Sequence, residues 1–123
     1  MDLPLAGAAG RAPADEPALL PTQRNEWDAL VEANELVLFM KGTPGSPRCG
    51  FSARAAGVLD RLGRPYAHVD VFATEDPART MLALREWAQF PTLPQVWVKG
   101  ELIGGSDIAA DMYDSGELQQ MLE

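Results

Sequence analysis

The residue best suited to chemistry in this chain is Cys49, the one cysteine among its 123 residues. It lies where a loop rich in glycine and proline, residues 41–48, meets the expected start of a helix. Backbone N–H groups and the macrodipole at a helix N-terminus favour a thiolate over a thiol. The surrounding residues 36–64 add five basic side chains against one acidic side chain: Lys41, Arg48, Arg54, Arg61 and Arg64 against Asp60. We therefore predict a lowered pKa and a reactive or ligating role for Cys49, the alternative being a small buried apolar residue.

The residue three positions after Cys49 is Ser52. In a dithiol oxidoreductase this position holds a second cysteine, which attacks the mixed disulfide and releases the product. A hydroxyl group cannot resolve a disulfide. Any turnover at Cys49 therefore requires a thiol supplied by another molecule.

The composition excludes several classes of protein. Eighteen acidic residues against ten basic ones give a net charge of −8, which opposes general binding of nucleic acid. No apolar run approaches the roughly 20 residues that a membrane helix needs. One cysteine and one histidine, His68, leave no intrachain disulfide and too few ligands for a thiolate or imidazole zinc site. We expect neither a nucleic acid nor a membrane as partner.

The hydrophobic pattern predicts eight elements that would position Cys49. In chain order they are a helix from Thr22 to about Asn34, a strand at 36–40, a helix from Cys49 to Leu62, a strand at 66–71, a helix from Thr74 or Asp76 to about 89, strands at 95–98 and 101–103 joined by a two-residue turn at Lys99-Gly100, and a last helix capped by Asp107. Strand, helix and strand in succession require a parallel crossover. The order αβαβαββα therefore predicts an α/β, thioredoxin-like fold, with a four-stranded mixed sheet flanked by helices.

The first 21 residues differ in composition from the remainder. They contain four prolines and six alanines and no aromatic residue, so they bury too little apolar surface to offset the entropy of ordering. We expect a disordered tail at 1–21, followed by one domain at 22–123. The alternative is a mitochondrial or plastid transit peptide, but acidic residues are present and serine is absent. A cytoplasmic protein is expected.

Four motifs together identify a family. They are Lys41-Gly42-Thr43-Pro44, Cys49-Gly50-Phe51-Ser52, Phe90-Pro91-Thr92-Leu93-Pro94-Gln95 and Gly104-Gly105-Ser106-Asp107-Ile108. In this order they resemble the monothiol glutaredoxins of the CGFS type, over roughly residues 26–122. The resemblance implies binding of glutathione and of a [2Fe–2S] cluster that bridges two subunits. It also implies a role in cluster delivery and iron homeostasis.

The resemblance assigns roles to individual residues. Cys49 matches the cluster ligand and the thiol that pairs with glutathione. Lys41 matches the lysine that holds the glycine carboxylate of glutathione, although it could be only a solvated strand end. Leu93 matches the residue whose backbone meets the cysteinyl part, and Pro94 matches a cis proline, with an ordinary turn proline as the alternative.

The other end of glutathione is assigned in the same way. Ser106 and Asp107 match the pair that binds the γ-glutamyl group, with the Asp107 carboxylate facing the ammonium, although Asp107 could be only a helix cap. Ser106 stands where the family often has cysteine. The segment between Asp70 and Phe90 is about three residues longer than is usual in the family. The arginine that meets a glutathione carboxylate is therefore expected at Arg79, with Arg85 as the alternative.

The remaining aromatic and imidazole side chains have structural interpretations. Trp27, Trp87 and Trp97 lie on separate elements, which favours packing over a stacking platform for bases. His68 is expected to be a strand histidine rather than a cluster ligand. A cysteine hydrolase would need a histidine base, and only His68 could serve.

Two functions stay open at this point. The first is an iron–sulfur carrier, whose partners would be apo iron–sulfur proteins and a BolA-like protein. A [2Fe–2S] cluster normally takes four ligands, usually thiolates, and one chain supplies one cysteine. The cluster-bound form is therefore expected to be a homodimer holding two glutathiones. The second function is removal of glutathione from protein mixed disulfides, with Cys49 as the sole nucleophile and at most weak enzymatic activity.

Overall fold

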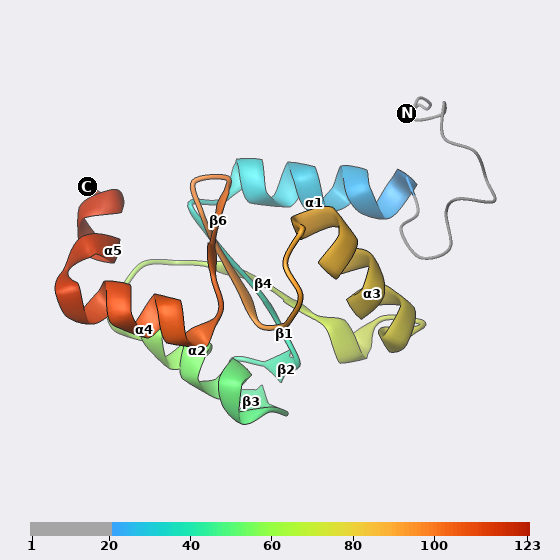
Figure 1. Cartoon of the computed structure of the whole chain (residues 1–123), viewed down its shortest axis with the longest axis horizontal. Coiled ribbons are helices and arrows are strands. Elements are labelled where there is room, and N and C mark those ends of the chain that lie inside the picture. Colours follow the sequence, from blue (N-terminus) through green and yellow to red (C-terminus); the bar gives the residue numbers. More distant parts are fainter. Residues whose placement is uncertain (1–20) are drawn as a thin grey trace.

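The structure, a computed structural model, describes residues 21–123, with side chains from Arg24 onward. The expected tail at 1–21 lies outside the described residues, except for Pro21, where the first helix begins. The elements are α1 (Pro21–Ala33), β1 (Leu36–Met40), β2 (Gly42–Thr43), β3 (Ser46–Pro47), α2 (Gly50–Leu62), β4 (Ala67–Asp70), the 3₁₀ helix η3 (Val71–Ala73), α3 (Pro77–Ala88), β5 (Gln95–Val98), β6 (Glu101–Gly104), α4 (Ser106–Ser115) and α5 (Glu117–Met121) (Figure 1).

The main sheet has four strands in the order β4-β1-β5-β6. β1 pairs with β4 in parallel and with β5 in the antiparallel sense, and β6 pairs antiparallel with β5. The predicted α/β, thioredoxin-like fold with a mixed four-stranded sheet is therefore confirmed. A second, two-stranded sheet made by β2 and β3 within the loop before Cys49 was not predicted.

The central strand β1 is buried on both faces, as its uninterrupted apolar run predicts. Leu36, Leu38 and Met40 pack with apolar residues of α2, α4 and α5. Val37 and Phe39 point to the opposite face and pack with residues of α1 and α3. Figure 1 shows the same two groups of helices on either side of the sheet. One strand therefore joins both halves of the core and ends directly before Lys41.

The three tryptophans meet in one aromatic cluster with Phe39. The ring centroids of Trp87 and Trp97 are 4.6 Å apart and the rings are stacked. Trp27 lies 5.4 Å from Trp87 and 6.1 Å from Phe39. The indole N–H of Trp87 donates to Asp28 Oδ1 at 2.9 Å. These contacts confirm the packing interpretation.

Two predicted helix starts, at Thr22 and at the Asp107 cap, are wrong. α1 begins at Pro21, so Thr22 lies inside the first turn instead of preceding the helix. α4 begins at Ser106 with Gly105 as its N-cap, so Asp107 is the second residue of the helix and does not cap it. The extended residue that precedes α4 is Gly105, and the Asp107 carboxylate bonds instead to Arg54, which is 53 positions away in the sequence.

Other boundaries agree with the sequence. Lys99 and Gly100 have φ angles of 51° and 85°, as a two-residue hairpin turn between antiparallel strands requires. Asp76 caps α3 by accepting a hydrogen bond from the backbone N–H of Arg79 at 3.2 Å. The expected last helix is divided at Gly116, whose φ of 85° ends α4 before α5 begins.

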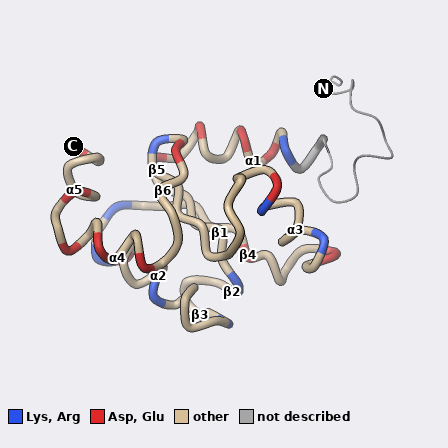
Figure 2. Tube along the Cα trace, in the orientation of Figure 1, with Lys and Arg blue, Asp and Glu red and all other residues tan. Residues whose placement is uncertain are grey.

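Charge is unevenly distributed over these elements. Figure 2 shows acidic residues along α4 and α5, and basic residues on α2 and near β2 and β3. The basic part of the surface is therefore next to the loop that carries Cys49. Within residues 21–123, no helix has both the length and the apolar character needed to cross a membrane.

Candidate functional site

Cys49 is the N-cap residue of α2. Its backbone is extended, with φ −160° and ψ 136°, and its carbonyl accepts the first helical hydrogen bond from the N–H of Ala53 at 2.9 Å. The residue is partly exposed and unpaired with any other cysteine. The predicted position of the thiol, at the junction of the loop and the helix, is therefore confirmed.

The environment lowers the pKa of the Cys49 thiol below its ordinary value. The largest cause is the backbone N–H of Ser52, which favours the thiolate. Partial burial opposes this effect, and the N–H of Phe51, the ammonium of Lys41 and the hydroxyl of Ser52 reinforce it. The helix N-terminus thus acts as predicted, but among the five neighbouring cations only Lys41 contributes to the lowering.

Arg48 does not contribute although it directly precedes Cys49. Its guanidinium lies over the ring of Phe72, 5.3 Å from the ring centroid. This cation–π contact holds the arginine against η3. Sequence proximity to Cys49 was therefore a poor guide to electrostatic proximity.

Ser52 occupies the position of a resolving cysteine but has a structural role. Its side chain is fully buried, and its hydroxyl accepts a hydrogen bond from the backbone N–H of Lys41 at 3.0 Å. The bond connects the end of β1 to the first turn of α2. It therefore fixes Lys41 with respect to Cys49.

A second anchor of the loop comes from Asp70, which the sequence analysis missed. Its Oδ1 accepts the backbone N–H groups of Gly42 and Phe72, both at 2.9 Å. The parallel register pairs Met40 with Asp70, so the carboxylate lies beside the residues that follow β1. An acidic residue ending the strand beside β1 was the signal that could have revealed it.

Gly42 has to be glycine for this loop to close. Its φ is +94°, and a Cβ atom would lie 2.6 Å from both the nitrogen of Arg48 and the carbonyl oxygen of Ser46. That close approach belongs to the β2–β3 pairing, in which Gly42 is opposite Pro47. The loop in front of Cys49 is therefore a fixed hairpin rather than an open connection.

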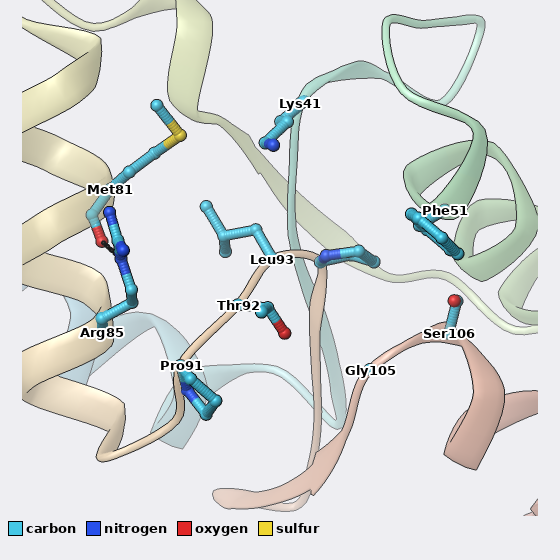
Figure 3. A pocket seen from close by; sticks show the side chains of 10 residues that line it. Lys41, Phe51, Met81, Arg85, Pro91, Thr92, Leu93, Gly105 and Ser106 are labelled. Atoms are coloured by element: carbon cyan, nitrogen blue, oxygen red, sulfur yellow. Dashed lines mark hydrogen bonds between the residues drawn. The ribbon is translucent and has the colours of Figure 1, made fainter.

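A cavity of about 590 Å³ lies beside this hairpin and the start of α2. Residues from five segments line it: Lys41, Phe51, Met81, Arg85, Pro91, Thr92, Leu93, Pro94, Gly105 and Ser106. In Figure 3, Met81 and Arg85 of α3 lie on one side of Leu93, and Phe51 and Ser106 lie on the other. The Leu93–Pro94 peptide bond is cis, as predicted.

The cavity brings together three of the predicted glutathione-binding residues: Lys41, Leu93 and Ser106. Cys49 and Asp107 do not line it, but each is close in sequence to a residue that does. The cavity has cations from two elements, Lys41 after β1 and Arg85 on α3, and apolar surface between them. Such a lining suits an extended ligand that carries a carboxylate.

The structure favours Arg85 over Arg79 as the arginine of this site. Arg85 lines the cavity together with Met81, whereas Arg79 does not. Met81 and Arg85 are four residues apart and share one face of α3, and Arg85 Nε donates to the Met81 carbonyl at 3.3 Å. Arg79 is two residues before Met81 and therefore belongs to another face of the helix. Of the two predicted arginines, the alternative Arg85 therefore lines the cavity, and Arg79 does not.

Asp107 forms an ion pair with Arg54 of α2. Asp107 Oδ1 and Arg54 Nη1 are 2.6 Å apart, and their side chains are 73% and 54% exposed. The pair lies at the N-terminus of α4, directly after the cavity residue Ser106.

Metal ligands are scarce in the described part of the chain. His68 is an exposed residue of β4, as expected for a strand histidine. Residues 21–123 contain no group of three or more His, Cys, Asp or Glu side chains placed to hold a metal ion. Cys49 is therefore the one thiolate that this chain could offer to a cluster.

Comparison with known proteins identifies the family of the chain. The glutaredoxin family model matches residues 36–103. The chain is 45% identical over 103 residues to an uncharacterized monothiol glutaredoxin of Synechocystis sp., covering 84% of this chain and 94% of the relative. It is 44% identical over 93 residues to glutaredoxin 4 of Escherichia coli K12, covering 76% of this chain and 78% of the relative.

Two solved structures extend the comparison. The crystal structure of a buckwheat glutaredoxin–glutathione complex matches with a TM-score of 0.71 and 30% identity, covering 82% of this chain and 87% of that one. The solution structure of reduced poplar apo GrxS14 matches with a TM-score of 0.69 and 37% identity, covering 81% and 89%. Fold, motifs and relatives agree. This chain belongs to the glutaredoxin family and groups with its monothiol members.

Proposed function

We propose that this protein binds glutathione in the cavity beside Cys49 and carries a [2Fe–2S] cluster between two subunits, for delivery to apo iron–sulfur proteins. The observation that supports this most strongly is a single thiol with a lowered pKa next to a preformed cavity that has two cations on its wall. A lone thiolate can hold or transfer a group, but it cannot form an internal disulfide. The chemistry must therefore be completed by a small-molecule thiol.

In this proposal, glutathione is bound along the cavity. Lys41 and Arg85 offer cations to its glycine carboxylate, and the backbone of Leu93 meets its cysteinyl part. Ser106 and Asp107 bind the γ-glutamyl end. The relative from buckwheat is described as a glutathione complex, which supports this assignment.

The donor set fits a cluster held jointly by two chains. One chain offers Cys49 alone, so two copies offer two thiolates and leave two positions for glutathione sulfur. Glutathione bound next to Cys49 would place its thiol beside the protein thiolate. The cluster is the cargo of the protein, and Cys49 is the residue that would hold it.

The second candidate function is reduction of glutathionylated proteins. The Cys49 thiolate would attack the glutathione sulfur of the mixed disulfide, forming a Cys49–glutathione disulfide and releasing the target protein as a thiolate. A second glutathione thiolate would then attack that disulfide, freeing Cys49 and leaving glutathione disulfide. The buried Ser52 hydroxyl accepts a hydrogen bond from the Lys41 N–H, and Ser52 has no thiol for the second step, which favours the carrier function.

Anaerobic reconstitution tests the carrier function. Apo-protein is incubated with iron, sulfide and glutathione, and size-exclusion peaks are analysed for visible absorption, iron, sulfide and glutathione. We expect a coloured dimer with one [2Fe–2S] cluster and two glutathiones, and a colourless apo monomer. A cluster that persists in Cys49→Ser, or that forms without added thiol, would contradict the proposal. A colourless product with brisk deglutathionylation would favour the second function.

The binding site is tested separately from the cluster. Arg85→Gln should weaken glutathione binding several-fold, because it removes a cation from the cavity wall. Arg79→Gln removes the same charge from the same helix and should leave the affinity close to that of the wild type. Isothermal titration calorimetry of the apo-protein distinguishes them. Equal losses in both variants would indicate a diffuse electrostatic effect.

The recipients and the compartment are also proposals. The carrier function implies apo iron–sulfur proteins as recipients, and a BolA-like protein is proposed as an alternative partner in place of one subunit. A cytoplasmic location is proposed on the same grounds as before, with mitochondria or plastids as the alternative. Affinity purification of the cluster-loaded dimer from cytosol, followed by mass spectrometry, tests these partners.

A further inference from the structure

The ion pair between Arg54 and Asp107 joins α2 to α4 at the rim of the glutathione cavity. Phe51, three residues before Arg54, lines the cavity, and so does Ser106, the residue before Asp107. Residues three apart on a helix share a face, so Arg54 projects from the side of α2 that also carries Phe51. Phe51 and Ser106 form the side of the cavity opposite to Arg85 (Figure 3). The pair joins neighbours of these two residues, and Arg54 also lines a separate hollow of about 290 Å³ between α2 and α4.

The pair has hydrogen-bonding capacity to spare. Among the described residues, Arg54 bonds through Nη1 alone and Asp107 through Oδ1 alone. A guanidinium has five N–H donors, and a carboxylate can accept at both oxygens. Both side chains are more than half exposed, so a ligand could reach them without a rearrangement of α2 or α4.

An ion pair of this kind discriminates between ligands by their charges. The charge of the Asp107 carboxylate is already balanced by the Arg54 guanidinium at 2.6 Å. A ligand with only an ammonium, or only a carboxylate, would therefore gain little from either group. A zwitterionic amino-acid group offers an ammonium to the carboxylate and a carboxylate to the guanidinium. The first turn of α4 adds unpaired backbone N–H groups and a favourable dipole for an anion at the same place.

We propose that Arg54 is a specificity-determining residue that binds the α-carboxylate of the γ-glutamyl group of glutathione, while Asp107 binds the adjacent ammonium. This inference rests on the proposed binding of glutathione and adds to it a residue outside the four motifs. The ion pair would then recognise the free amino-acid end of the ligand. The glycine end is left to Lys41 and Arg85 on the far side.

The test compares glutathione with γ-aminobutyryl-cysteinyl-glycine, which is glutathione without the α-carboxylate. Both ligands keep the ammonium, so any effect of releasing Asp107 is common to both and cancels in the ratio of their dissociation constants. The proteins are the full-length apo wild type, Arg54→Gln and Arg61→Gln. Arg61 is two turns further along the same helix and is not paired with Asp107, so it is the matched control for loss of charge.

We expect the wild type to prefer glutathione over the analogue, and Arg54→Gln to reduce that preference by about two- to fivefold, the range of an exposed ion pair. Arg61→Gln should keep the wild-type ratio. Thermal unfolding verifies that the variants are folded. An unchanged ratio in Arg54→Gln, with or without tighter binding of both ligands, would overturn this inference alone. A wild type that binds neither ligand would overturn the proposed function as well.

Discussion

The two walls of the cavity beside Cys49 are held in different ways. On the β1 side, backbone N–H groups of consecutive residues, Lys41 and Gly42, are bonded to the buried Ser52 hydroxyl and to Asp70. On the α4 side, an exposed ion pair between Arg54 and Asp107 joins the N-terminal part of α2 to the first turn of α4. The first arrangement fixes the main chain, whereas the second involves only side chains that can rearrange. The loop beside the thiol is therefore fixed through its main chain, whereas the Arg54–Asp107 side depends on exposed side chains.

The largest expected effect comes from Gly42 on the rigid side. Gly42→Ala places a Cβ atom 2.6 Å from backbone atoms of Ser46 and Arg48, at a φ of +94°. We expect a loss of about 2–4 kcal/mol in the free energy of unfolding. Gly45→Ala is the control, because a Cβ there meets nothing within 4 Å. Urea denaturation measures the free energy of unfolding of both variants. Equal values would show that the hairpin is not fixed.

The next effect concerns the Asp70 anchor. Asp70→Ala leaves the N–H groups of Gly42 and Phe72 without their acceptor, both in part-buried positions. We expect a loss of about 1–3 kcal/mol in the free energy of unfolding, measured by urea denaturation. Asp70→Asn retains an acceptor oxygen and should recover part of the loss. A loss shared equally by both variants would assign the effect to charge instead of hydrogen bonding.

A smaller effect is expected on the thiol itself. The ammonium of Lys41 lowers the Cys49 pKa, so Lys41→Ala should raise it and move the alkylation curve to higher pH, since only the thiolate reacts. Arg48→Ala should leave the curve in place, because Arg48 lies over Phe72. Iodoacetamide alkylation rates across pH measure both. A shift in Arg48→Ala as large as in Lys41→Ala would contradict the placement of Arg48.

The smallest effect is expected at the adaptable rim. Asp107→Asn breaks an ion pair whose side chains are 73% and 54% exposed, so screening by solvent limits its contribution. We expect the free energy of unfolding to fall by less than about 1 kcal/mol. Chemical denaturation at low and high salt gives the value. A loss comparable to that in Gly42→Ala would remove the contrast between the two walls.

The order of the elements and the position of the thiol could be predicted because their signals are local. The apolar run at Leu36–Met40, the glycine and proline loop before Cys49 and the turn at Lys99-Gly100 each depend on neighbouring residues. The cis peptide before Pro94 followed from the family motif.

The sequence analysis failed, or left alternatives open, where residues far apart in the sequence determine a side chain's partner. Asp107 looks like a cap in sequence, but Arg54 from another helix takes its carboxylate. The choice between Arg79 and Arg85 depends on which face of α3 meets the cavity. The longer segment before Phe90 left open which residues lie on that face. Asp70 became an anchor only through the parallel pairing of β4 with β1. Side-chain partners across the fold were the part that the sequence could not supply.

The aromatic cluster gives this protein an intrinsic optical probe. Trp27, Trp87 and Trp97 belong to the half of the core in which Leu93 is packed, and α3 carries both Trp87 and Arg85. A ligand that contacts Leu93 and Arg85 would therefore change the surroundings of stacked indoles, and hence the wavelength and intensity of their emission. Occupancy of the β1 and α3 side of the cavity should then be readable by tryptophan fluorescence without any label. Events confined to Arg54 and Asp107, on the other side of the sheet, should leave that emission almost unchanged.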